Sequence, residues 1–167
     1  KLKSCIKLKK GCKILLHPVN KPELYGVAEV SKNKIISIKE KPKKTRSNLA
    51  ITGLYFFDNK VVQYSKNLKL SKRGELEIVD LLIKYKKNNR LTTEFLGRGG
   101  AWLDAGSIED FYKTSAFVST LENRQGLKIA CLEEIALNYA WINKKDLKSG
   151  INFYGKCLYS NYLRKLI

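Results

Sequence analysis

The chain has 167 residues, of which 44% are hydrophobic, and a formal net charge of +18 at pH 7. This length suits one domain or a part of a larger one, and the apolar fraction excludes an intrinsically disordered chain. No apolar run approaches the roughly 18 residues of a membrane span, and no segment has the pattern of a signal peptide. We therefore expect a cytoplasmic protein that does not contact a membrane.

The cysteines and the histidine limit which disulfide and metal sites the chain can form. Cys5, Cys12, Cys131 and Cys157 show no Cys-x-x-Cys spacing, which favours free thiols over a disulfide framework or a zinc site. His17 is the only histidine, so a metal cluster built from several histidines is excluded. A structural role is expected for this side chain.

The excess of 33 basic over 15 acidic residues suggests attraction to polyanions. However, the basic residues are spread along nearly the whole chain and are mostly lysines between apolar positions. We interpret most of this charge as solvated surface. A degenerate basic fragment that binds nucleic acid or another polyanion remains the less favoured alternative.

Predicted strands dominate the first hundred residues. The basic segment Lys1–Lys13 has no regular period and is expected to be poorly ordered. Five β-rich runs are predicted to be strands: 14–16, 25–30, 34–39, 49–57 and 91–96. The second and third form a hairpin around Ser31-Lys32-Asn33. The run 49–57 is long and apolar, and we expect it to be a central strand covered on both faces.

Predicted helices dominate the last sixty residues. Helical spacing and capping residues place helices at 60–65, 75–87, 107–121, 132–142 and 144–148. The helix beginning at Ser107 should bury an apolar face that contains Ile108, Phe111 and Tyr112. The segment after 148 is weakly patterned.

The glycine-rich stretch Gly97–Gly106 carries one carboxylate, Asp104, between a predicted strand and a predicted helix. Acidic groups at the carboxyl end of a strand commonly hold ligands or metals in open α/β sheets. The local alternative, which the residues alone favour, is that Asp104 caps the helix or closes a turn.

Two further pairs and one single arginine could carry chemistry. Glu40 and Lys41 end a strand and could hold a sugar hydroxyl and a phosphate, or be an exposed terminus. Arg73 precedes a helix, where guanidinium and backbone N–H groups gather phosphate, or it is a surface residue. Tyr25 and Gly26 could form an aromatic wall with close backbone approach, or Gly26 could mark a bulge.

Together, these segments resemble the second half of the bacterial glucose-1-phosphate thymidylyltransferases, which belong to the sugar nucleotidyltransferases. The resemblance is carried by residues 17–27, 40–42, 47–58, 73–78, 97–106 and 122–128. It implies an α/β, Rossmann-like fold with a mixed, mostly parallel sheet and flanking helices. A related transferase that uses another nucleotide is the nearest alternative.

The resemblance also implies roles for individual residues. Tyr25 and Gly26 would contact the hexose, Glu40 would hold its hydroxyls, and Ile51 would pack along it. Lys41 and Arg73 would bind the sugar phosphate and act in catalysis. Asp104 would be one of two aspartates that bind Mg²⁺, and Arg98 and Glu134 would belong to a regulatory nucleotide-sugar pocket.

The implied substrates are dTTP and glucose 1-phosphate, and the implied assembly is a homotetramer. The product, dTDP-glucose, would supply dTDP-rhamnose for surface polysaccharide. Three segments are expected: residues 1–13, outside the resemblance; 14–106, which bind the sugar phosphate; and 107–167, which are helical. The family's nucleotide loop and first metal aspartate would lie upstream, so we expect this chain to be inactive alone.

Overall fold

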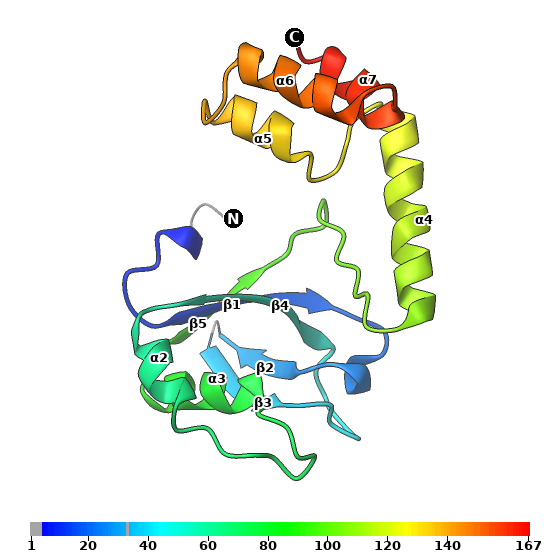
Figure 1. Cartoon of the computed structure of the whole chain (residues 1–167). Coiled ribbons are helices and arrows are strands. Elements are labelled where there is room, and N and C mark those ends of the chain that lie inside the picture. The colour runs from blue at the N-terminus through cyan, green and yellow to red at the C-terminus, as the bar shows by residue number, and fades with distance from the viewer. Residues whose placement is uncertain (1–4, 33) are drawn as a thin grey trace. The chain divides into compact units, whose positions relative to one another are not determined.

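The computed structural model describes residues 5–32 and 34–167. The chain forms two compact units, Lys1–Trp102 and Leu103–Ile167, and the division falls inside the glycine-rich stretch Gly97–Gly106. Figure 1 shows the strands in the first unit and a helical second unit. The two units are described separately below.

The first unit is built on a five-stranded sheet with the strand order β3-β2-β4-β1-β5 (Figure 1). The strands are β1 (Cys12–Pro18), β2 (Val27–Ser31), β3 (Lys34–Lys39), β4 (Leu49–Phe57) and β5 (Leu91–Phe95). The sheet is mixed, as expected. Parallel pairing was expected to dominate, but within the described residues only β1 and β5 pair in parallel, and the other neighbours are antiparallel.

The hairpin of β2 and β3 and the bounds of β4 agree with the sequence prediction. β4 is the central strand, but the expectation that both its faces are covered is wrong at Gly53 and Leu54, which are exposed. Tyr55 and Phe57 pack against the main core, and strand alternation points Leu54 to the opposite face. The apolar run therefore predicted the strand correctly and its burial only in part.

The N-terminal basic segment is more ordered than we expected. Lys1–Ser4 lie outside the described residues, but Cys5 is fully buried and Cys12 and Lys13 already belong to β1. Gly11 precedes this strand with φ of +92°, and a Cβ there would lie 2.5 Å from the Arg90 carbonyl oxygen. Glycine is therefore required where the chain enters the sheet.

Two helices of the first unit, α2 (Lys60–Ser65) and α3 (Ile78–Lys87), lie on one side of the sheet (Figure 1). Alternate residues of β1 and buried residues of α3 share one core cluster, in which Ile14, Leu16, Leu82 and Tyr85 are almost fully buried. α3 begins three residues later than predicted because residues 71–77 form a hydrogen-bonded loop instead. Ile78 is consequently exposed rather than part of the core.

Asp58 joins three parts of this unit through its carboxylate. Oδ2 accepts a hydrogen bond from the Gly11 N–H at 2.7 Å, and Oδ1 accepts from the Tyr85 hydroxyl at 2.7 Å and the Lys60 N–H at 3.1 Å. Burial raises the pKa of Asp58, but these hydrogen bonds outweigh that effect and the pKa lies below its usual value. The carboxylate thus ties β1 and α3 to the start of α2.

Replacing Asp58 by asparagine should lower the free energy of unfolding by about 1.5–3 kcal/mol at pH 7, the range for hydrogen bonds to a charged group. Because the folded-state pKa is depressed, this stability is present above about pH 4 and is lost as pH falls through the folded-state pKa. Urea unfolding at pH 7 and pH 3 measures the free energy of unfolding of the wild-type chain and the variant at each pH. Asp80→Asn, on an exposed position of α3, is the matched control, and equal effects of both variants would contradict the prediction.

The second unit contains α4 (Ile108–Gln125), α5 (Leu132–Asn138), α6 (Lys144–Tyr154) and α7 (Leu158–Arg164). Ser107 caps α4, since its hydroxyl accepts a hydrogen bond from the Asp110 N–H at 3.1 Å. α5 is shorter and α6 longer than predicted, and α7 was not predicted. None of the described helices is long and apolar enough to cross a membrane.

The core of the second unit is formed by α6, α7 and the residue before α5: Cys131, Leu147, Ile151, Tyr162 and Leu163. The expected burial of an apolar α4 face is wrong, because Ile108, Phe111 and Tyr112 are 92%, 64% and 74% exposed. Helical spacing identified the helix, but it could not show whether another element covers that face. All four cysteines are free, as predicted.

Candidate functional site

Three segments of the first unit bring predicted site residues together beside β4. Tyr25 and Gly26 precede β2, Glu40 and Lys41 follow β3, and Ile51 lies in β4. The Lys41 N–H donates to the Tyr25 carbonyl at 3.1 Å, and the Ile51 N–H donates to the Gly26 carbonyl at 2.8 Å. Main-chain hydrogen bonds therefore fix these five residues as one group.

Gly26 forms the floor of this group. A Cβ at this position would lie 3.0 Å from Glu40 Oε2, 3.4 Å from Val79 Cγ2 and 3.5 Å from Ile51 Cδ1. The space that glycine leaves open is thus bounded by one carboxylate and two aliphatic side chains. Such a surface can pack against an apolar ring face while the carboxylate accepts hydrogen bonds from hydroxyl groups.

Lys41 stands at the rim of the group. It is exposed, and its φ of +37° is left-handed, which is uncommon for a residue with a side chain. The hydrogen bond from its N–H to Tyr25 holds this backbone conformation. Lys41 can therefore present an ammonium group beside Glu40 from a fixed main chain.

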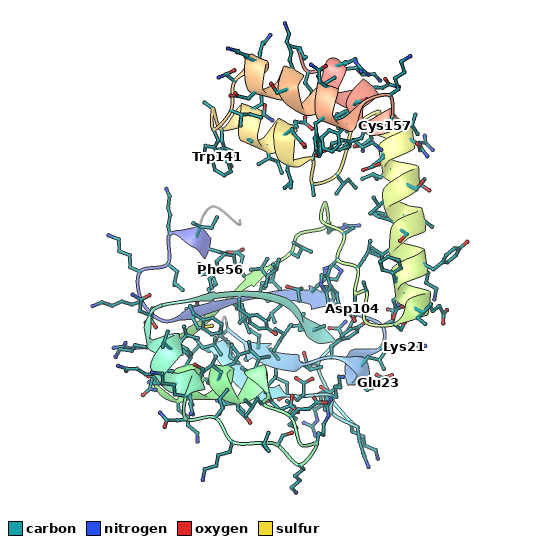
Figure 2. All side chains as sticks on the ribbon, viewed as in Figure 1. Lys21, Glu23, Phe56, Asp104, Trp141 and Cys157 are labelled. Carbon is teal, nitrogen blue, oxygen red and sulfur yellow. The ribbon has the colours of Figure 1, made fainter. Side chains whose placement is uncertain are left out.

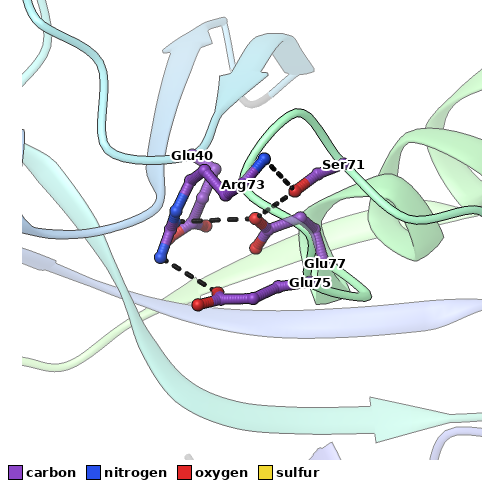
Figure 3. A network of polar contacts seen from close by, with 5 residues as sticks. All are labelled: Glu40, Ser71, Arg73, Glu75 and Glu77. Carbon is purple, nitrogen blue, oxygen red and sulfur yellow. Dashed lines mark hydrogen bonds and ion pairs between the residues drawn. The ribbon is translucent and has the colours of Figure 1, made fainter.

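Arg73 lies in a network of acidic side chains (Figure 3). Its Nη2 donates to Glu75 Oε2 at 3.0 Å, while its Nη1 lies 3.5 Å from Glu77 Oε1 and 3.9 Å from Glu40 Oε1. The Ser71 hydroxyl donates to Glu77 Oε1 at 3.0 Å and accepts from the Arg73 N–H at 3.1 Å. The loop before α3 therefore connects Arg73 to the group around Gly26 through Glu40.

The charge of Glu40 depends on these neighbours. Burial raises the pKa of Glu40 first and repulsion from Glu77 raises it further, while Lys41 and Arg73 lower it, and the net shift is upward. A partly desolvated carboxylate of this kind gains from hydrogen-bond donors on a ligand. Hydroxyl groups of a polar ring would supply them.

An aromatic cluster completes the group, and the sequence predictions gave no site role to two of its members, His17 and Trp102. The Trp102 ring lies 5.0 Å from the Tyr25 ring and 6.1 Å from the His17 ring, and its Nε1–H donates to the Thr52 carbonyl at 3.1 Å. Within the part of the chain that the structure describes, His17 Nδ1 is buried without a hydrogen-bond partner. Trp102 stood in the glycine-rich stretch as the only large aromatic residue, which was the available signal.

The residues that the sequence predicted for this group lie together in the structure. Several other residues, which the sequence predictions did not place there, also belong to it. Val79 forms part of the wall beside Gly26, and Ser71, Glu75 and Glu77 hold Arg73. The signal for Glu75 and Glu77 was the pair of acids shortly after Arg73. Their convergence on one guanidinium depends on the loop conformation, which local patterns do not reveal.

Asp104 belongs to the second unit, two residues after Trp102. Its side chain is exposed (Figure 2), and its Oδ2 lies 3.0 Å from where a Gly106 Cβ would be. Ser107, not Asp104, caps α4, so the capping alternative is wrong. The described residues contain no group of three or more metal-ligand side chains, but a single carboxylate suits Mg²⁺, which takes most of its other ligands from water and phosphates.

The two residues of the expected regulatory pocket lie in different units. Arg98 is in the loop after β5, in the first unit, and Glu134 is in α5, in the second. Glu134 Oε2 accepts a hydrogen bond from the Tyr162 hydroxyl, which ties α5 to α7. This contact gives Glu134 a role in the fold of the second unit, and the regulatory role stays a prediction.

Curated glucose-1-phosphate thymidylyltransferases are similar to this chain in sequence. A glucose-1-phosphate thymidylyltransferase of Neisseria gonorrhoeae is 45% identical over 158 residues, which are 94% of this chain and 55% of that protein. One from Xanthomonas campestris pv. campestris (strain B100) is 46% identical over 154 residues, 89% of this chain and 52% of that protein. The chain thus spans about half the length of the curated relatives it matches.

Among solved structures, a Bacillus anthracis protein assigned to the glucose-1-phosphate thymidylyltransferases, in complex with sucrose, matches with a TM-score of 0.62 and 42% identity. The match covers 70% of this chain and 46% of that one. A UDP-glucose pyrophosphorylase complexed with UDP-glucose matches with a TM-score of 0.57 at 24% identity, which shows a shared fold.

The sequence model of the family described as nucleotidyl transferase matches residues 2–120. This range contains the whole first unit from residue 2 onward, including the group around Gly26 and the Arg73 loop. It also includes residues 2–13, which we expected to lie outside the resemblance. The chain belongs to the nucleotidyl transferase family.

Proposed function

We propose that this chain carries the sugar-phosphate-binding part of a glucose-1-phosphate thymidylyltransferase. The observation that carries the proposal is the convergence of Gly26, Glu40, Ile51 and Arg73 in one unit. Together they offer a glycine beside an aliphatic side chain, a hydroxyl acceptor and a guanidinium, which match a hexose that bears a phosphate. The names of the relatives support thymidylyl transfer to glucose 1-phosphate as the reaction.

The proposed chemistry joins two anions. A phosphate oxygen of glucose 1-phosphate attacks the α-phosphorus of dTTP, the bond to the β-phosphate breaks, and pyrophosphate leaves as dTDP-glucose forms. In this chain, Glu40 orients the hexose through its hydroxyls, while Arg73 and Lys41 balance the charge of the nucleophilic phosphate. Positioning and charge neutralisation of this kind account for most of the catalysis in phosphoryl transfer.

Mg²⁺ is the proposed metal and Asp104 the residue that would hold it. When bound, the ion would neutralise phosphate charge at the reacting centre. One carboxylate with substrate phosphates is an ordinary ligand set for Mg²⁺. We further propose a homotetrameric assembly and a place for the product in dTDP-rhamnose supply, both supported by family resemblance.

Calorimetric titration with glucose 1-phosphate, glucose and inorganic phosphate tests the proposal. We expect the sugar phosphate to bind more tightly than either part alone, and Lys41→Ala to weaken it. Equal binding of inorganic phosphate and glucose 1-phosphate would contradict a hexose site. Salt-dependent binding to duplex DNA without any binding of sugar phosphate would instead support the polyanion alternative.

Replacing Gly26 by alanine should weaken glucose 1-phosphate binding by about tenfold while leaving inorganic phosphate binding unchanged. The added methyl group would crowd Glu40 and occupy the surface proposed for the hexose, and filling such a space costs about 1–3 kcal/mol. Titration with both ligands, alongside thermal melting, checks this. Gly150→Ala, where a Cβ meets no atom within 4 Å, is the control, and an equal loss for both ligands would count against the hexose assignment.

A further inference from the structure

Arg73 already has an anionic partner at the exposed end of its side chain. Nη2 forms a hydrogen-bonded ion pair with Glu75 Oε2 at 3.0 Å, the shortest of its three carboxylate contacts (Figure 3). A carboxylate and a phosphate make the same kind of charge-assisted hydrogen bonds to a guanidinium. The Glu75 carboxylate therefore occupies a position on Arg73 that a phosphate oxygen could take.

The acidic neighbours of Arg73 differ in how firmly they are held. The Glu77 side chain is 13% exposed, accepts a hydrogen bond from Ser71 and directly precedes α3 as its N-cap residue, so its position is fixed by the fold. The Glu40 side chain is 24% exposed and lies against Gly26. The Glu75 side chain is 60% exposed, and its one contact in the described network is Arg73.

We propose that Glu75 is an internal counter-anion that competes with the ligand phosphate for Arg73 and is displaced when a phosphate monoester binds. The inference rests on the proposed function, because it assigns the Arg73 guanidinium to a phosphate. Glu77 and Glu40 stay in place and hold Nη1, while Nη2 exchanges its carboxylate for a phosphate oxygen. Glu75 thus lowers the affinity of the site for phosphate without touching the sugar.

The energies favour this exchange. An exposed ion pair such as Arg73–Glu75 contributes little, so its loss is a small cost to ligand binding. A phosphate monoester near neutral pH carries nearly two negative charges against one on the carboxylate. A phosphodiester carries one, so the competition should favour free sugar phosphate over ligands whose phosphate is already esterified twice.

Removing the Glu75 charge should therefore tighten phosphate binding. Glu75→Gln keeps the size of the side chain and is expected to lower the dissociation constants for inorganic phosphate and for glucose 1-phosphate by about two- to fivefold, the range for loss of one exposed charge pair. The control is Glu109→Gln, which changes the net charge equally at the exposed Glu109–Lys113 pair of α4. Calorimetric titration of both variants and the wild-type chain gives the comparison.

Each result of these titrations supports or rejects the counter-anion role of Glu75. Tighter binding of both ligands in Glu75→Gln alone supports the proposal, whereas unchanged or weaker binding, or an equal gain in Glu109→Gln, overturns it. If the wild-type chain binds glucose 1-phosphate more tightly than inorganic phosphate and Glu75→Gln changes neither dissociation constant, the proposed function is supported and the counter-anion role of Glu75 is rejected. If Glu75→Gln tightens the binding of inorganic phosphate but neither the wild-type chain nor any variant prefers the sugar phosphate, the counter-anion role of Glu75 is supported and the proposed hexose site is rejected.

Discussion

Replacing Arg73 by alanine is expected to weaken glucose 1-phosphate binding by about 10- to 100-fold, because charge-assisted hydrogen bonds contribute about 1.5–3 kcal/mol. Lysine should restore only part of the affinity, since an ammonium group cannot bind two oxygens in the planar geometry of a guanidinium. The Arg73 side chain is 42% exposed and its shortest ion pair is with the exposed Glu75, so its replacement should disturb the fold little. Titration calorimetry measures the loss.

The matched control is Arg124→Ala, which removes the same charge from an exposed position near the end of α4. It should change binding by less than about twofold, since screening in salt makes distant surface charges weak. If Arg73→Ala binds glucose 1-phosphate as the wild-type chain does, Arg73 is not the phosphate ligand and the proposed site loses its principal cation.

Replacing Leu82 by alanine should lower the free energy of unfolding of the first unit by about 2–5 kcal/mol, the range for large-to-small changes in a packed core. Leu82 has no exposed surface and packs in the cluster that joins β1 to α3. α3 follows the Arg73 loop directly, so the same change should also reduce the affinity for sugar phosphate. Urea unfolding followed by circular dichroism measures the stability.

Leu70→Ala serves as the control, because Leu70 is 68% exposed and belongs to the same unit. Its effect should stay within about 0.5 kcal/mol, as for most surface substitutions. A Leu82→Ala variant as stable as this control would mean that α3 does not hold the sheet through this cluster.

Local patterns predicted the elements of the first unit well. β4 and α2 have the predicted bounds, and the hairpin of β2 and β3 lies where the turn residues placed it. The error at α3 arose because the acids at Glu75 and Glu77 resemble a helical first turn, while their side chains instead bind Arg73 and Ser71. A local pattern cannot distinguish acids that favour a helix terminus from acids that hold a cation.

The candidate site was predictable mainly through family resemblance. Locally, each of three site residues had an ordinary alternative: Gly26 as a bulge, Glu40 as an exposed strand terminus and Arg73 as a surface residue. The hydrogen bonds from Lys41 to Tyr25 and from Ile51 to Gly26 connect segments far apart in the sequence, and no local pattern contains them. The contacts of Trp102 and the acidic partners of Arg73 likewise follow from strand order and loop conformation.

The burial of apolar surface was the least predictable property. The pattern of α4 is helical and amphipathic, yet Ile108 and Tyr112 are exposed. In the central strand, Leu54 is exposed although the run around it is continuously apolar. Periodicity reports which residues share a face, whereas burial also requires a covering element, and that element is not encoded in the segment itself.

A crystal structure of this chain with glucose 1-phosphate tests the central claim most directly. The account predicts the hexose against Gly26, its hydroxyls on Glu40, and its phosphate on Arg73 with Glu75 displaced. A hexose bound elsewhere, or a phosphate held by other lysines while Arg73 keeps its acidic partners, would contradict it.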